Sequence, residues 1–288
     1  MEEYPLAGGA INAVTRRGNI VYRTGGPWVP AIHAVLDHLR AQGFAYAPRA
    51  LGIDAQGRDM TSFLAGSSMM RPWRPVMFTK DALDQVATML RELHAATRGL
   101  ALPAETEWRS GPAAKAPGQV IRHGDLGPWN MLWQGDRLTG LIDWDFAEPG
   151  LPLTDLAQLA LYAVPLRGDD HWRECGFPKR PDFRRRLEVL CEAYGGVEPD
   201  QVTGEVVRLQ ESAINEITTR AAEGRYPWTM FLENGEVERT RAELAWIRQT
   251  LPEWFPGLGP ALPYPPFTPG DGVFRLAGIR PEHATNPE

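Results

Sequence analysis

Cysteine is nearly absent from this 288-residue sequence, which contains only Cys175 and Cys191. Two thiols are too few for a disulfide framework, and a zinc site needs about four nitrogen, sulfur or oxygen ligands. The sequence also lacks an apolar run near the roughly 20 residues that a membrane-spanning helix needs. Its first residues lack the basic and then apolar order of a secretion signal. These absences predict structural thiols, no membrane partner and a cytoplasmic location.

An excess of positive charge is absent as well. The chain has 30 Lys and Arg residues against 36 Asp and Glu residues, a formal net charge of -6. A general nucleic-acid binder needs a clustered basic surface, so no nucleic-acid partner is expected. Hydrophobic residues make up 43% of the chain and charged residues 23%, which is typical of a folded globular protein. The length allows one large domain or two smaller ones that share a cleft, and the composition leaves the oligomeric state open.

Residues 1–63 predict a small β-rich N-terminal lobe. A helix is expected over residues 28–42, because apolar residues recur there at helical spacing before Gly43. Short β-type runs surround this helix, and the last two are joined by a turn; they occupy residues 19–23, 51–54 and 58–63.

Residues 64–255 predict a larger and mainly helical C-terminal lobe. One helix should begin after Thr79 as its N-cap and end at Gly99, and another should begin at Pro181 and end at Gly195. Two longer helices should follow. Three short β-type runs are expected at residues 120–123, 130–133 and 138–142. Residues 256–288 are rich in proline and predict an extended tail.

The segment from His123 to Asn130 and the later pair Asp143 and Asp145 have the residue types that phosphoryl transfer requires. The elements match the H-x-D-x-x-x-x-N loop and the metal-binding Asp of kinases. Asp125 would accept the hydrogen bond and then the proton of an acceptor hydroxyl. Asn130 and Asp143 would supply oxygen ligands to magnesium, and His123 would brace the loop.

These residues resemble the aminoglycoside phosphotransferase family, and the resemblance covers nearly the whole chain. It implies an α+β, bilobal protein-kinase-like fold. The small β-rich lobe, residues 1–63, would bind nucleotide, and the larger helical lobe, residues 64–255, would carry the catalytic and acceptor-binding groups. It also implies ATP or GTP with Mg2+ as the phosphoryl donor and the hydroxyl of a small molecule as the acceptor. The resemblance does not identify that acceptor, because the family acts on several classes of compound.

The resemblance places Arg23 where a Lys or Arg contacts the nucleotide phosphates, and arginine offers a fork of donors suited to them. A Glu on the following helix would normally pair with this base. Here residues 31–34 contain His33 and no carboxylate, and the next acidic residue is Asp37. The ion pair is therefore absent, shifted to Asp37 or replaced. Adenine is expected at the junction of the lobes, at Ser62, Phe63 and Leu64.

Four further assignments remain open from the sequence. Asp145 is either an additional metal-site carboxylate or a capping or surface residue, and Asp155 is expected to brace the catalytic loop. Residues 8–12 or 16–19 could cover the phosphates, or form ordinary turns. The carboxylates on one predicted helix could line an acceptor cleft or simply be solvated; they are Glu205, Glu211, Glu216 and Glu223.

Two functional classes compete for this sequence. The first is a small-molecule kinase, which the combination of Asp125, Asn130 and Asp143 favours. The second is a nucleotide-binding pseudokinase or regulatory module, which the missing helix Glu and the weak glycine loop favour. A protein kinase is disfavoured because no activation segment separates Asp143 from the next helix.

Overall fold

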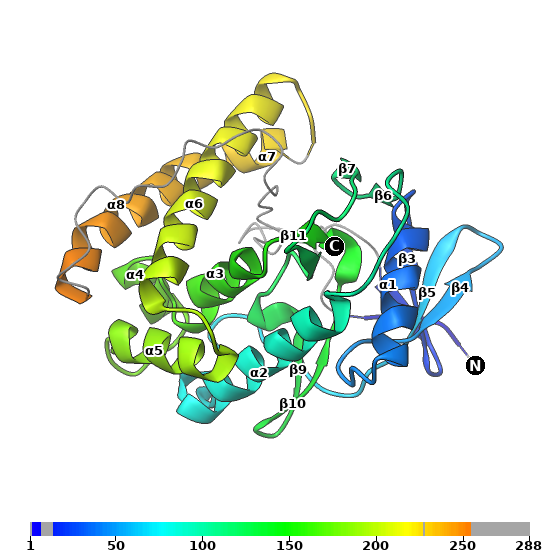
Figure 1. Ribbon diagram of the computed structural model, residues 1–288, viewed down its shortest axis with the longest axis horizontal. Helices are drawn as coiled ribbons and strands as arrows, with labels where there is room; N and C mark the ends of the chain where they lie inside the picture. Colours follow the sequence, from blue (N-terminus) through cyan, green and yellow to red (C-terminus); the bar gives the residue numbers. More distant parts are fainter. Residues whose placement is uncertain (1, 7–13, 227, 255–288) are drawn as a thin grey trace, which may run out of the picture.

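The computed structural model describes residues 2–6, 14–226 and 228–254. An antiparallel five-stranded sheet with strand order β1-β2-β3-β5-β4 forms the N-terminal part, followed by a mainly helical region (Figure 1). The predicted α+β class is therefore confirmed. The expected phosphate-covering residues 8–12 and the Pro-rich tail at 256–288 lie outside the described residues.

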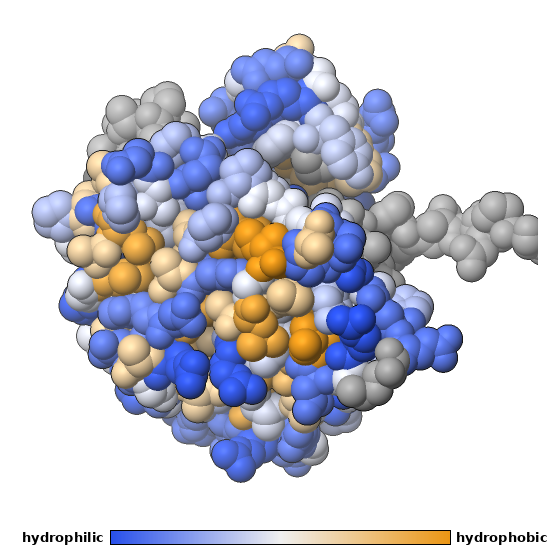
Figure 2. Space-filling view, turned by 90° about the vertical axis from the view of Figure 1, so that its right-hand side faces the viewer, coloured by the Kyte–Doolittle hydropathy of each residue, from blue (hydrophilic) through white to orange (hydrophobic). Residues whose placement is uncertain are grey.

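The sheet and one helix build the N-terminal part. α1 (Val29–Ala41) lies between β3 and β4 in sequence, one residue inside the predicted bounds at each end, and buries the expected apolar stripe. The strands are β1 (Tyr4–Pro5), β2 (Val14–Arg17), β3 (Ile20–Thr24), β4 (Ala50–Ile53) and β5 (Arg58–Ser62). Figure 2 views the molecule from this side and shows separate hydrophobic areas among hydrophilic ones. Leu51 and Ile53 on edge strand β4 are among the exposed large hydrophobic residues.

The central part combines a long helix with short strands that carry the sequence motifs. Thr79 caps α2 (Lys80–Thr97) as predicted, because its hydroxyl accepts from the Ala82 N–H at 3.1 Å. The remaining elements here are η1 (Pro75–Phe78), β6 (Glu107–Trp108), β7 (Gly111–Pro112), β8 (Val120–Arg122), η2 (Pro128–Asn130), β9 (Met131–Gln134), β10 (Arg137–Leu141), η3 (Trp144–Phe146) and β11 (Glu148–Gly150). The β6–β7 hairpin lies in a stretch rich in proline, glycine and alanine.

Helices complete the rest of the described chain. They are α3 (Pro152–Ala163), α4 (Asp169–Glu174), α5 (Phe183–Tyr194), α6 (Pro199–Ala222), α7 (Trp228–Glu233) and α8 (Glu236–Trp254). The predicted start of α5 at Pro181 is wrong by two residues. Asp182 caps this helix instead by accepting from the Arg185 N–H at 2.9 Å, so Pro181 lies before the cap.

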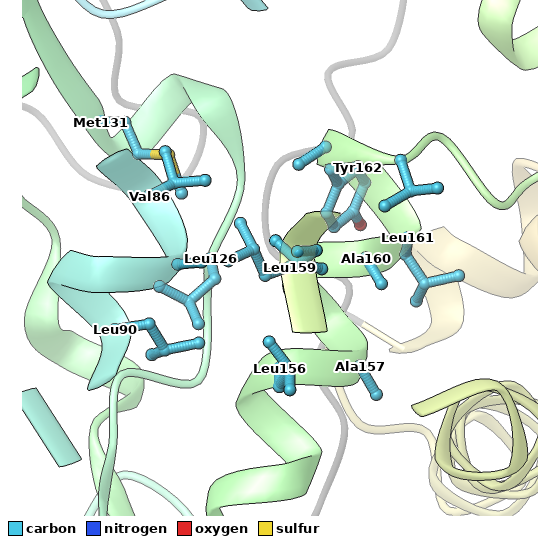
Figure 3. Packing of buried hydrophobic residues seen from close by; sticks show 14 of the residues in the cluster. Val86, Leu90, Leu126, Met131, Leu156, Ala157, Leu159, Ala160, Leu161 and Tyr162 are labelled. Carbon is cyan, nitrogen blue, oxygen red and sulfur yellow. The ribbon is translucent and has the colours of Figure 1, made fainter. Parts of the chain in front are cut away.

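The hydrophobic core fixes the position of the motif segment relative to the helices. Leu126 lies between α2 and α3, with Leu90 on one side and Leu156 and Leu159 on the other (Figure 3). Leu126 is fully buried, so the residue after Asp125 anchors the loop in the core. No helix in the described ranges is long and apolar enough to cross a membrane.

Candidate active site

The backbone from His123 to Leu126 is held by two side chains of α3. Asp155 accepts hydrogen bonds from the N–H groups of His123 at 2.7 Å and Gly124 at 3.2 Å. Gln158 accepts from the Leu126 N–H at 3.0 Å and donates to the Gly124 carbonyl at 3.0 Å. A rigid helix therefore fixes the loop on both sides of Asp125. The sequence predicts that Asp155 braces the loop, whereas no recognisable motif includes Gln158.

Gly124 has a backbone position that only glycine can occupy. Its φ is 77°, and a Cβ there would lie 2.3 Å from the carbonyl oxygen of Phe146. The loop and the segment after Asp143 are thus packed backbone against backbone, which brings the two motifs together.

His123 connects the same two segments through its ring. Its Nδ1 accepts from the Asp125 N–H at 3.3 Å, so Nε2 carries the proton and donates to the Ile142 carbonyl at 3.1 Å. Burial lowers the pKa of His123 below its ordinary value, which keeps the ring neutral. These contacts agree with the predicted role of His123 in bracing the loop.

The Asp125 carboxylate is buried, and its two oxygens have different surroundings. Oδ2 accepts from Asn130 Nδ2 at 2.7 Å and from Trp129 Nε1 at 3.3 Å. Oδ1 is buried, and no described group donates a hydrogen bond to it. Burial and then the charge of Asp143 raise the pKa of Asp125 well above its ordinary value. The protein therefore orients one carboxylate oxygen and leaves the other without a hydrogen bond from the described residues.

Asp143 has a left-handed backbone with φ 63°, the only positive φ among the described non-glycine residues. Its side chain is 45% exposed, whereas Asn130 is buried. Backbone strain of this kind is maintained by surrounding structure and is common at functional sites. The strain turns the carboxylate toward the N-terminal sheet, where Arg23 Nη1 donates to it at 2.9 Å.

Arg23 donates hydrogen bonds to three carboxylates, so it has acidic partners although the helix Glu is missing. Arg23 lies directly opposite Asp59 in the register of β3 and β5, and its Nη2 donates to Asp59 at 3.1 Å. His33 on α1 bonds the other oxygen of Asp59 at 2.6 Å. Asp59 therefore replaces the Glu, and the suggested shift to Asp37 is wrong because Asp37 is exposed on α1 and Arg23 bonds elsewhere.

Asp145 is neither a surface residue nor a side-chain cap. Its Oδ1 accepts from Arg23 Nη2 at 2.7 Å and its Oδ2 from Arg109 Nη1 at 3.1 Å. Asp145 is 3% exposed, and burial raises its pKa above the ordinary value. Arg109 is a site residue that sequence reasoning misses, because a single Arg in a loop rich in Pro, Gly and Ala matches no motif.

Burial lowers the pKa of Arg23, but the carboxylates of Asp145, Asp143 and Asp59 outweigh burial and hold that pKa above its ordinary value. Arg23 is therefore a permanent cation between the sheet and the motif segment. Its Nε is buried and has no hydrogen-bond partner among the described residues. A buried N–H donor without a partner fits an acceptor atom of a ligand, such as a phosphate oxygen.

The metal-ligand prediction fits the kind of oxygen donors present. Asn130 and Asp143 offer an amide and a carboxylate oxygen, which are ligands that magnesium accepts. The described residues contain no group of three His, Cys, Asp or Glu side chains arranged for a metal ion. Magnesium commonly uses one or two protein ligands and completes its shell with substrate phosphates and water, so two ligands suffice.

The expected adenine site lies at the end of β5. The N–H groups of Ser62 and Phe63 donate to the carbonyls of Arg49 and Asn19, each at 2.9 Å. A base at this position would have to use the carbonyl oxygens or Leu64, and the assignment stays a prediction. Of residues 16–19, the first two end β2, and Gly18, with φ 61°, and Asn19 form the turn to β3.

The four carboxylates that could line an acceptor cleft, three on α6 and one at its C-cap, do not form a free anionic surface. Each of the four carboxylates pairs with an arginine; the pairs are Glu205–Arg208, Glu211–Arg248, Glu216–Arg220 and Glu223–Arg225. Aromatic side chains lie closer to the catalytic loop, where Trp129 packs edge-on against Tyr162 with ring centroids 4.7 Å apart. This side of Asp125 is thus aromatic.

Comparison with known proteins shows what this chain is similar to. The model of the phosphotransferase enzyme family matches residues 104–177, which contain Arg109 and both motifs. The trifolitoxin immunity protein of Rhizobium leguminosarum bv. trifolii is 34% identical over 226 residues, or 77% of this chain and 85% of that protein.

Two more distant proteins are also similar to this chain, one in sequence and one in structure. A homoserine kinase of Methylobacterium nodulans is 31% identical over 187 residues, or 64% of this chain, but the match spans only 51% of that protein. The GDP complex of aminoglycoside 2'-phosphotransferase-IIIa shares 18% identity at a TM-score of 0.53, covering 85% of this chain and 93% of that one. The structural likeness confirms the kinase-like fold. The chain belongs to the phosphotransferase enzyme family.

Proposed function

We propose that this protein is a small-molecule kinase that transfers the γ-phosphoryl group of a magnesium-bound nucleotide, ATP or possibly GTP, to an acceptor hydroxyl. The observation that carries the proposal is the Asp125 carboxylate. It is buried, its Oδ2 is fixed by Asn130 and Trp129, and its Oδ1 lacks a partner among the described residues. A buried oxygen without a donor, within reach of the charge of Asp143, fits an acceptor hydroxyl.

The proposed step forms one bond between the acceptor oxygen and the γ-phosphorus and breaks the bond from that phosphorus to the bridging oxygen. Asp125 Oδ1 orients the hydroxyl and takes its proton, while the nucleoside diphosphate leaves with the electron pair. Magnesium, when bound, would neutralise the phosphate charge. Asn130 and Asp143 would hold it, and Arg23 would contact the phosphates. Ser62, Phe63 and Leu64 would contact the base.

The chain's own surfaces bear on the acceptor class. The α6 carboxylates are neutralised by arginines, which does not favour a polycationic antibiotic. Trp129 and Tyr162 beside the catalytic loop favour an acceptor with an apolar or aromatic part next to its hydroxyl. The relatives suggest two concrete candidates, homoserine and trifolitoxin. An immunity function would follow if phosphorylation inactivated a toxin.

The test is magnesium-dependent nucleotide consumption by the purified protein against homoserine, trifolitoxin, choline, sugars, macrolides and aminoglycosides. Asp125→Ala is the blank. Asp136→Asn is the matched control, because Asp136 lies exposed in the turn between β9 and β10. Stimulation by one compound class in the wild type and the control, but not in the blank, supports the proposal. Nucleotide binding without turnover across the whole panel would instead support the pseudokinase alternative.

A further inference from the structure

Arg109 is presented by a hairpin whose neighbouring residues are both anchored. Trp108 is 1% exposed, and its Nε1 donates to the Ala113 carbonyl at 2.9 Å across the hairpin. On the other side, the Ser110 hydroxyl donates to Glu148. Glu148 also accepts from the buried Arg122 at 2.6 Å. The direction of Arg109 between these anchors is therefore set by the hairpin.

The guanidinium of Arg109 lies between two aromatic rings from different parts of the chain. Its Cζ is 4.8 Å from the ring centroid of Trp28, which precedes α1, and 4.6 Å from that of Phe146. Its Nη1 donates to Asp145 Oδ2 at 3.1 Å, and its side chain is 19% exposed. Flat contacts on two rings hold an arginine without consuming its hydrogen-bond donors.

The arrangement of charges around Asp145 gives Arg109 a specific task. Arg23 and Arg109 each take one oxygen of Asp145, while Arg23 also bonds Asp143. Magnesium at Asp143 and phosphate at Arg23 would compete with the hydrogen bond that joins these two side chains. If Asp145 had no second cation, it would keep its bond to Arg23, because a buried carboxylate is costly to leave unpaired.

We propose that Arg109 is a positioning residue that serves as the second counterion of Asp145 and so frees Arg23 for the nucleotide phosphates. The proposal rests on the proposed kinase function. The two proposals make different predictions, because the role of Arg109 concerns nucleotide affinity and not the identity of the acceptor. Nucleotide affinity should depend on the charge of Arg109, and only while Asp145 is also charged.

The test measures the dissociation constant of magnesium-ATP by calorimetric titration for the wild type, Arg109→Gln, Asp145→Asn and the double variant. Arg109→Gln should weaken binding about tenfold or more, as expected when one partner of a buried charge pair is removed. Adding Asp145→Asn should restore the affinity to within about threefold of the Asp145→Asn variant, because the unpaired charge is gone. Arg241→Gln on the exposed face of α8 is the matched control.

Two outcomes overturn the inference while the kinase proposal stands: unchanged affinity in Arg109→Gln, or no recovery in the double variant, which would reduce Arg109 to a packing role. Failure of the wild type to bind any nucleotide would overturn the kinase proposal and this inference with it. Arg109→Lys gives a second readout if Arg109→Gln fails to fold. Lysine keeps the charge but loses the flat contact, so its affinity should lie within about threefold of wild type. A tenfold loss there would contradict the counterion role.

Discussion

Arg23 and Asp59 lie opposite each other on β3 and β5, and Asp59 takes the place of the helix carboxylate that the family resemblance leads one to expect. α1 contributes His33 to the pair, bonded to Asp59 at 2.6 Å. The helix thus still supports the arginine, but through a histidine and a strand carboxylate in series. In this chain the carboxylate partner of the arginine lies on the sheet and not on the helix.

Asp59→Asn should therefore lower both stability and nucleotide affinity. The change removes one charge from a pair in which the Asp59 side chain is 3% exposed, and we expect a loss of about 2 kcal/mol in the free energy of unfolding. Arg23 would turn further toward Asp143 and Asp145. Denaturant unfolding and nucleotide titration measure the two effects.

The matched control for that variant is His33→Gln, which keeps a hydrogen-bond donor near Asp59. Its affinity for nucleotide should remain within about threefold of wild type, because the glutamine amide can donate to the same Asp59 carboxylate. Equal behaviour of Asp59→Asn and wild type would show that Asp59 is not the partner Arg23 depends on.

The sequence predicts the fold class and the paired motifs because they depend on local signals. Loop spacing, strand-flanking turns and the Thr79 cap are all readable within a few residues. Contacts between distant segments are a different matter. The β3–β5 register places Asp59 beside Arg23 across 36 residues, and Arg109 reaches Asp145 from a hairpin that its composition hides. Such partners follow from tertiary packing, which no local pattern encodes.

Asp125→Asn should abolish turnover and yet leave the protein at least as stable at neutral pH. The pKa of Asp125 is raised in the folded state, so its contribution to stability is present at low pH and is lost as pH rises from the unfolded pKa through the folded one. An amide of the same size removes that cost. We expect turnover to fall by about 100-fold or more while the melting temperature rises by about 2 °C.

Activity assays and thermal melting at pH 7 test this pair of expectations together. Asp136→Asn serves again as the control, with no change in either quantity. A large drop in the melting temperature of Asp125→Asn would mean that the ionised carboxylate stabilises the loop, contrary to its unpaired Oδ1.

Asp143→Asn should impair magnesium-dependent turnover without unfolding the protein. Asparagine tolerates the left-handed backbone that this position requires, so the φ of 63° does not oppose the change. The substitution removes a ligand charge without changing side-chain size, and turnover should fall by about 100-fold. Raising the magnesium concentration should recover part of the loss. Full activity at ordinary magnesium would contradict the metal-ligand assignment.

Asp155→Asn should loosen the catalytic loop and lower stability at neutral pH. The carboxylate accepts from two backbone N–H groups and from His94 at 3.3 Å, and an amide oxygen cannot serve all three equally. We expect a loss of about 2 kcal/mol in the free energy of unfolding at pH 7. Asp84→Asn, which changes a surface carboxylate paired with Lys80, is the matched control and should have little effect.

The pH dependence of the Asp155→Asn difference gives a sharper test than its size. Burial raises the pKa of Asp155, but the His94 hydrogen bond and the other partners outweigh burial and hold it below the ordinary value of 3.8. A depressed folded pKa means that the stabilisation is present above the unfolded pKa and is lost as pH falls through the folded one. The stability gap between wild type and variant should therefore be wide at pH 7 and narrow below about pH 4. Asp125 is common to both proteins, so its opposite pH dependence cancels in the difference. A gap that stays constant from pH 7 to pH 3 would show that the Asp155 charge does not hold the loop.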